Sequence, residues 1–332
     1  MTAAILPGPA AAVTKNISLK GAHIMSTNYN VVSSVVNSDN VGTMRRYAAA
    51  AMPAGSIVIN QKVTDKIAFC QSCNIDKIAA AGVSGIGPKD GMITNKYGIF
   101  ASNNYSGKVT DIAGISGFAG DNPRCIARAL AGDGICSKCF SFLGARFNNL
   151  PAWIKNDTIF STVKMRIGDI ILDPALVPEM RYSTHGDLIN GLHAYNYIVT
   201  AAGNPDTQFT LWTKNHKEYT DGLRMFAADY GTEKPHNLRV LYSANRLDQY
   251  FTDYQLISLK ERGYDGIFAV YSTWAAQTAA VSMGAYRCVC GTGSCKYRCH
   301  FCYNSMAAAG NVWSTNKSVW IAEILDGERH KE

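Results

Sequence analysis

The amino-acid sequence predicts an α/β fold in which repeated βα units form a parallel sheet or a partial (βα) barrel. From residue 180 onward, short apolar segments alternate with helical segments of about 10–15 residues. Polar residues follow each apolar segment, as expected where strands leave a parallel sheet. Hydrophobic residues make up 47% and charged residues 17% of the chain, a balance that is typical of globular proteins.

The predicted elements follow a regular order. Strands are expected at 180–184, 208–212, 238–242 and 266–271, and helices at 188–202, 217–230, 253–262 and 273–282. An earlier apolar stretch at 111–118 is the candidate first strand, and 285–289 is predicted to lead into the last cysteines. Right-handed crossovers place the carboxyl ends of parallel strands at one edge, so we expect the functional site there.

The chain divides into four predicted regions: a loose arm at 1–25, an irregular region at 26–110, the βα-repeat core at 111–284, and a cysteine-rich metal knuckle with a C-terminal segment at 285–332. No apolar run reaches the ~18 residues of a transmembrane helix. No basic segment precedes the first apolar residues, so a secretory signal is not predicted. We expect a cytoplasmic protein with no membrane partner. The net charge of +7 permits a nucleic-acid partner without requiring one.

Ten cysteines are the most informative feature of the composition. Cys290, Cys295, Cys299 and Cys302 are closely spaced near the C-terminus, and Cys288 lies just upstream. Four thiolates at such spacing can surround one metal centre, either zinc or an iron–sulfur cluster. We interpret this closed set of four ligands as structural or as an electron relay.

A second set of cysteines, formed by Cys125, Cys136 and Cys139, follows the candidate first strand. Three cysteines leave one iron of a 4Fe–4S cluster without a protein ligand, which makes this set the better candidate for catalysis. The alternative is a zinc site completed by a histidine or by Cys70 and Cys73.

Polar and titratable residues are expected to meet at the carboxyl edge of the sheet. These candidate site residues are His185, Gly186, Asp187, Lys214, Ser243 and Asn245. Asparagine and threonine in such positions also cap helices, which is the alternative interpretation of Asn215, Asn245 and Thr273.

The cysteine spacing Cys295-x3-Cys299-x2-Cys302 and the open set of three resemble radical S-adenosylmethionine (SAM) enzymes, over about 110–305. The resemblance implies that the cluster on the three upstream cysteines binds SAM. His185 and Asp187 would then assist catalysis, while Gly186, Lys214, Ser243 and Asn245 would bind the cofactor. That family holds the SAM amine with a Gly-Gly-Glu segment, where this chain departs from the pattern with Gly186 and Asp187. The resemblance implies that these two residues hold the SAM amine, since a carboxylate beside a glycine can still accept hydrogen bonds from an ammonium.

A second resemblance, to phage and mobile-element proteins of the gene product 88 type, covers about 120–305. It is carried by the segments 122–125, 135–140, 181–190, 209–214 and 234–238 and by the terminal cysteines with Tyr303. The resemblance implies a viral or mobile-element origin, a host-cytoplasmic location and a metal-binding α/β domain. Phe140 departs from the tyrosine expected there, and the reaction is not specified.

Three functions remain open from the sequence. The first is a radical SAM-like iron–sulfur enzyme with two 4Fe–4S clusters and an unknown small-molecule or macromolecular substrate. The second is a zinc-stabilised viral protein that binds nucleic acid or protein without catalysis. The third is a structural or accessory protein of a virion.

Overall fold

The computed structural model describes residues 16–19, 22–25, 92–103, 112–131, 135–139, 141, 150–288, 302 and 317–324. Three predicted metal ligands, Cys290, Cys295 and Cys299, lie outside these residues, and so do Cys70 and Cys73. All the other candidate site residues lie within them. No helix in the described part of the chain is both long and apolar enough to cross a membrane.

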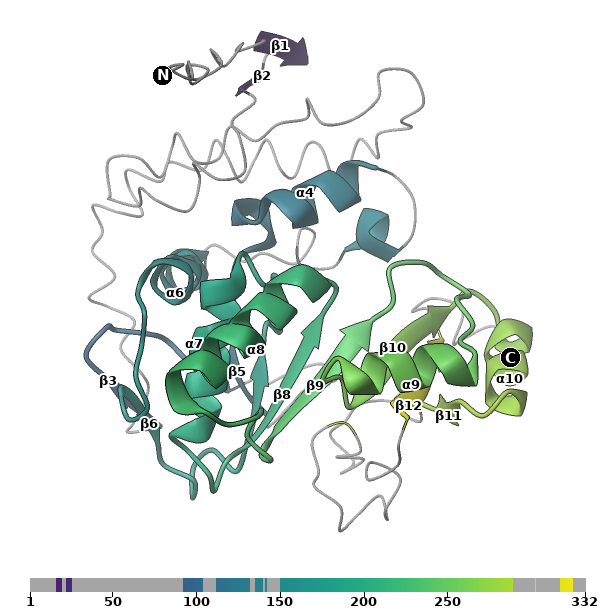
Figure 1. The fold of residues 1–332 in the computed structure, drawn as a ribbon. Coiled ribbons are helices and arrows are strands. Elements are labelled where there is room, and N and C mark those ends of the chain that lie inside the picture. Colours follow the sequence, from purple (N-terminus) through teal and green to yellow (C-terminus); the bar gives the residue numbers. More distant parts are fainter. Residues whose placement is uncertain are drawn as a thin grey trace, which may run out of the picture.

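The main sheet has eight strands in the order β11-β12-β10-β9-β8-β7-β5-β4 (Figure 1). All neighbours pair in parallel except β4, which is antiparallel to β5. The predicted fold class of repeated βα units is therefore confirmed. The strands are β4 (Ser102–Asn103), β5 (Ala113–Ile115), β7 (Glu179–Tyr182), β8 (Gln208–Thr213), β9 (Leu238–Ser243), β10 (Gly266–Tyr271), β11 (Tyr286–Arg287) and β12 (Val319–Ile324).

Helices lie between the consecutive strands from β5 to β11. They are α4 (Pro123–Leu130), α6 (Leu150–Thr162), α7 (Gly191–Ala202), α8 (His216–Tyr230), α9 (Asp253–Glu261) and α10 (Trp274–Ser282), with short 3-10 helices η5 (Ala119–Asp121) and η6 (Ile135–Lys138). Two small antiparallel pairs complete the described elements: β1 (Asn16–Leu19) with β2 (Ala22–Met25), and β3 (Ile93–Asn95) with β6 (Ile170–Leu172).

Local chemistry explains where the elements differ from the predicted bounds. The helix expected at 188–202 begins at Gly191, because the Asn190 side chain accepts a hydrogen bond from the His193 N–H and caps it. The strand β7 ends at Tyr182, because Ser183 has a φ of 49°, which extended strands do not allow. The strand β12 was not predicted, and it lies between β10 and β11.

The helices α6, α7, α8, α9 and α10 lie on one face of the sheet (Figure 1). Along β8, Phe209 and Leu211 belong to the core beneath α6, α7 and α8, whereas Trp212 packs with Phe268 on the opposite face. The same alternation holds in β10, where Ile267 belongs to the core beneath α9 and α10. In the described part of the chain the crossover helices thus cover one face of the sheet, which is the arrangement found in (βα) barrels.

The helix α4 lies across the carboxyl ends of the strands, as Figure 1 shows. Its cap, Asn122, fixes this position. The Asn122 side-chain oxygen accepts from the Arg124 N–H, and its amide group donates to the carbonyls of Asp187 and Leu188 at 2.9 and 3.0 Å. The first turn of α4, which carries Cys125, is thereby attached to the segment after β7.

Candidate functional site

The three upstream cysteines lie at the carboxyl edge of the sheet, on α4 and around η6. Burial raises the pKa of the Cys125 thiol well above its ordinary value. The charges of Asp187 and of the other two cysteines, Cys139 and Cys136, raise it further. The backbone N–H of Cys139 donates to the Cys136 carbonyl at 3.1 Å. The structure therefore brings the three predicted thiols into one electrostatic environment.

Two cations lie beside these thiols. The positive charges of Lys214 and Arg128 lower the pKa of Cys136, against the larger effect of burial, which raises it. The Arg128 guanidinium donates to the Lys214 carbonyl at 3.1 Å. The Lys214 ammonium in turn donates to the Ser243 hydroxyl at 2.8 Å. The predicted residues Lys214 and Ser243 thus form one connected polar group next to the thiols.

Asp187 is buried and its carboxylate is hydrogen-bonded within the chain. One oxygen accepts from the Leu188 N–H at 2.8 Å and from the Thr213 hydroxyl at 2.6 Å. The other accepts from the Lys214 N–H at 3.0 Å and lies 3.9 Å from a nitrogen of Arg128. The carboxylate therefore joins the ends of β7 and β8 and partly balances the charge of Arg128.

Gly186 is required by its surroundings. Its φ is +80°, and a Cβ at this position would lie 3.1 Å from the backbone of Gly117. The Gly117 N–H donates to the His185 carbonyl at 3.0 Å, which holds the two segments together. Gly186 therefore has a packing role at the site, in addition to the cofactor-binding role predicted for it.

His185 stacks on Trp153 of α6, with ring centroids 4.2 Å apart. Burial and the positive charge of Arg181 lower the pKa of His185 to about 4, so the imidazole is neutral at pH 7. A neutral imidazole can accept a proton or bind a metal, but it is no general acid at that pH.

Of the three residues that the sequence allows as helix caps, one caps a helix with its side chain and two do not. The Thr273 hydroxyl accepts from the Ala276 N–H and caps α10. Asn215 precedes α8 without a side-chain capping bond, and its amide group donates to the Leu188 carbonyl. Asn245 does not cap a helix. Its amide group donates to the Tyr242 hydroxyl at 3.4 Å, and its buried side-chain oxygen has no partner within the part of the chain that the structure describes.

Arg128 was missed by sequence reasoning, although a signal was present. It lies three residues after Cys125, and residues at that spacing share one face of a helix. Sequence reasoning also assigned no role to Arg181, whose guanidinium lies over the ring of Trp212, 4.1 Å from the ring centroid.

The described residues contain no group of three or more His, Cys, Asp and Glu side chains arranged to hold a metal ion. Cys302 is buried, and its carbonyl accepts from the Thr210 hydroxyl at 3.0 Å. The last cysteine of the terminal set therefore contacts β8 on the face opposite the helices.

Comparison of the chain with protein-family models, curated proteins and solved structures finds no match in any of the three. The chain's own residues at the carboxyl edge are therefore the basis for assigning a function.

Proposed function

We propose that the protein is an iron–sulfur enzyme of the radical SAM-like type, with an open cluster held by Cys125, Cys136 and Cys139. One observation carries the proposal: these three thiols, Arg128 and Lys214 share one electrostatic environment at the carboxyl edge of a singly wound βα sheet. When bound, the cluster supplies one-electron chemistry.

The charges around the three thiols favour such a centre. Metal binding requires deprotonated thiols, and burial opposes that deprotonation at Cys125. The positive charge of Arg128 favours the thiolate form of both Cys125 and Cys136, and Lys214 adds to the effect at Cys136. The two cations therefore stabilise the negative charge that three thiolates would bring into a buried site.

The remaining residues have separate roles in the proposal. Asp187 acts as a positioning residue, since its carboxylate already accepts three hydrogen bonds from the chain. In this proposal Asp187 therefore positions the chain, whereas the resemblance to radical SAM enzymes assigned it to the SAM amine. Lys214 and Ser243 remain the proposed cofactor-binding pair, since their side chains meet beside the thiols.

Metal and sulfide content, with a visible absorption spectrum, tests the proposal on full-length protein purified without oxygen. We expect iron and sulfide, and we expect a triple variant with serine at 125, 136 and 139 to lose the iron of one cluster. Cys288→Ser is the matched control, because it removes a half-exposed thiol outside both predicted ligand sets. Protein without iron and sulfide would overturn the proposal, and zinc alone would support the non-catalytic binding protein.

A further inference from the structure

The face of the sheet opposite the helices carries a stacked pair of side chains that the proposed metal centre does not use. The guanidinium of Arg181, from β7, lies 4.1 Å from the ring centroid of Trp212, from β8. The Trp212 ring packs in turn on Phe268, from β10, with centroids 4.2 Å apart. The Trp212 ring therefore contacts Arg181 from the adjacent strand and Phe268 from β10, which lies beyond β9.

Both members of this pair have a buried nitrogen that finds no hydrogen-bond partner among the described residues, namely Nε of Arg181 and Nε1 of Trp212. Native structures leave few buried donors unpaired, because each such donor loses its hydrogen bonds to water without replacement. Arg181 also forms no ion pair with any residue in the described part of the chain. The pair therefore offers a positive charge and two N–H donors that lack an acceptor.

The position of the pair along β8 relates it to the cysteines. Thr210 contacts the Cys302 carbonyl, and Lys214 lies beside Cys136. Thr210 and Trp212 are alternate residues of β8, so their side chains project from the same face, and Lys214 follows directly after the end of the strand. Trp212 therefore lies along the chain between the contact with Cys302 and the pair of Lys214 and Ser243.

We propose that Arg181 and Trp212 form a subsite for an oxyanion group, either a carboxylate or a phosphate. Such a group offers two or more acceptor oxygens and the negative charge that a planar guanidinium binds best. The indole N–H contributes a second, neutral donor from the neighbouring strand. That the oxyanion belongs to the substrate of the enzyme rests on the proposed function; its binding at the pair does not.

Tryptophan fluorescence reports on this subsite directly. Full-length protein is titrated with inorganic phosphate and, separately, with acetate, at constant ionic strength so that screening does not mimic binding. We expect a saturable change with at least one of the two probes, and we expect Trp212→Phe to abolish it. A response to phosphate alone identifies a phosphate-bearing ligand, and a response to acetate alone identifies a carboxylic acid.

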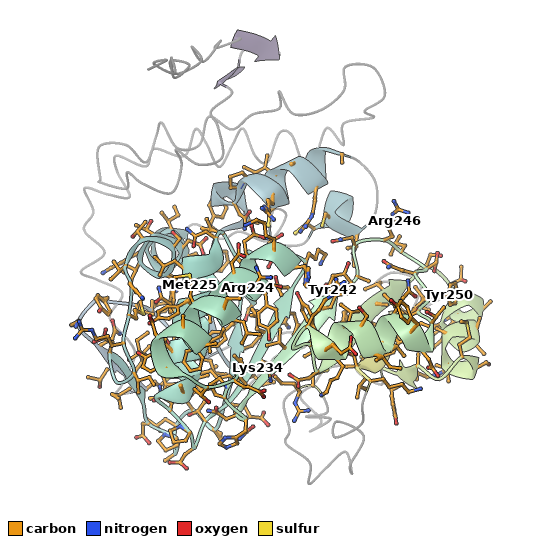
Figure 2. The ribbon with its side chains drawn as sticks, in the orientation of Figure 1. Arg224, Met225, Lys234, Tyr242, Arg246 and Tyr250 are labelled. Atoms are coloured by element: carbon orange, nitrogen blue, oxygen red, sulfur yellow. The ribbon has the colours of Figure 1, made fainter. Side chains whose placement is uncertain are left out.

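Charge variants separate the subsite from general electrostatics. Arg181→Gln should weaken binding about tenfold or more, as expected for loss of a charged hydrogen bond. Arg181→Lys keeps the charge but lacks the planar guanidinium, so this variant should bind the oxyanion more weakly than the wild type. It replaces the glutamine variant in the test if that variant does not fold. Arg224→Gln, on the exposed surface of α8 (Figure 2), is the matched control and should bind like the wild type.

Two outcomes would overturn the subsite: no saturable change with either probe, or unchanged affinity in both Arg181 variants. Iron content measured on the same preparations distinguishes failure of the oxyanion subsite from failure of the proposed iron–sulfur function. Arg181→Gln should retain the iron of the wild type, and phosphate or acetate binding is expected whether or not iron is present.

Discussion

The hydroxyl of Thr213 donates a hydrogen bond to the carboxylate of Asp187 at 2.6 Å, which joins the ends of two neighbouring parallel strands. The same carboxylate raises the pKa of the Cys125 thiol. The buried carboxylate of Asp187 therefore both connects the ends of β7 and β8 and raises the pKa of a predicted cluster ligand.

Replacing Asp187 with asparagine should make the thiols more acidic in metal-free protein. The negative charge of Asp187 raises the pKa of both Cys125 and Cys136, so its removal favours thiolate at lower pH. The pH dependence of alkylation by iodoacetamide, resolved by peptide mass spectrometry, measures the change. Thr213→Val is the control, because it removes the hydrogen bond but keeps the charge. An equal shift in both variants would contradict the electrostatic explanation.

Gly186→Ala should destabilise the fold more than Gly231→Ala. Both glycines have positive φ values, +80° and +64°, so alanine costs about 1–2 kcal/mol of stability at either position. At Gly186 the new Cβ would also press on the backbone of Gly117, whereas it has open space at Gly231. Urea denaturation measures both free energies of unfolding. Equal losses would show that the close approach of Gly117 has no energetic consequence.

Acid should destabilise the protein through His193. Burial lowers the pKa of this residue from 6.5 to about 3 in the folded state. Between these pH values the unfolded chain binds one more proton, so stability is complete above about pH 6.5 and is lost as the pH falls towards 3.

The expected slope is about 1.4 kcal/mol per pH unit for one such histidine. His185, with a folded-state pKa of about 4, adds a similar slope over a narrower range. The His193 ring lies among the rings of Phe160 and Tyr197, so phenylalanine can replace it. His193→Phe should remove about half of the combined pH slope of the two histidines. Urea denaturation at several pH values checks this, and an unchanged slope in the variant would refute the assignment.

Thr210→Val should expose Cys302 to thiol reagents. The Thr210 hydroxyl is buried and donates to the Cys302 carbonyl, so its loss leaves that carbonyl without this partner and weakens the contact by about 1–3 kcal/mol. Thr207→Val is the matched control, because it removes an equally buried hydroxyl that donates to the Val177 carbonyl instead. Faster alkylation of Cys302 in both variants would indicate general loosening.

The fold could be predicted from 180 to 282 because each element there carries its own signal. Strand β10 is uniformly apolar, and Thr252 and Thr273 mark helix starts by capping. The strand β12 escaped prediction because its short apolar segment stands apart from the repeat. Its place between β10 and β11 is decided by contacts in space, which periodicity does not encode.

The site could be predicted only in outline. Parallel topology implied that residues after different strands would meet, and the structure joins Asp187, Lys214 and Ser243 in this way. The roles of Arg128 and Arg181 depend on how α4 crosses the sheet and on which ring a guanidinium covers. Those relationships arise from packing between elements, so the order of residues alone does not reveal them.

The place of β12 in the sheet has a consequence for synthesis on the ribosome. Strand β10 leaves the exit tunnel long before its partner at 319–324, and β11 also pairs with that late strand. In the nascent chain, β10 therefore exposes a line of unpaired backbone groups until the segment holding the four terminal cysteines has been made. Completion of the sheet is thus timed to follow the translation of every cysteine in the protein.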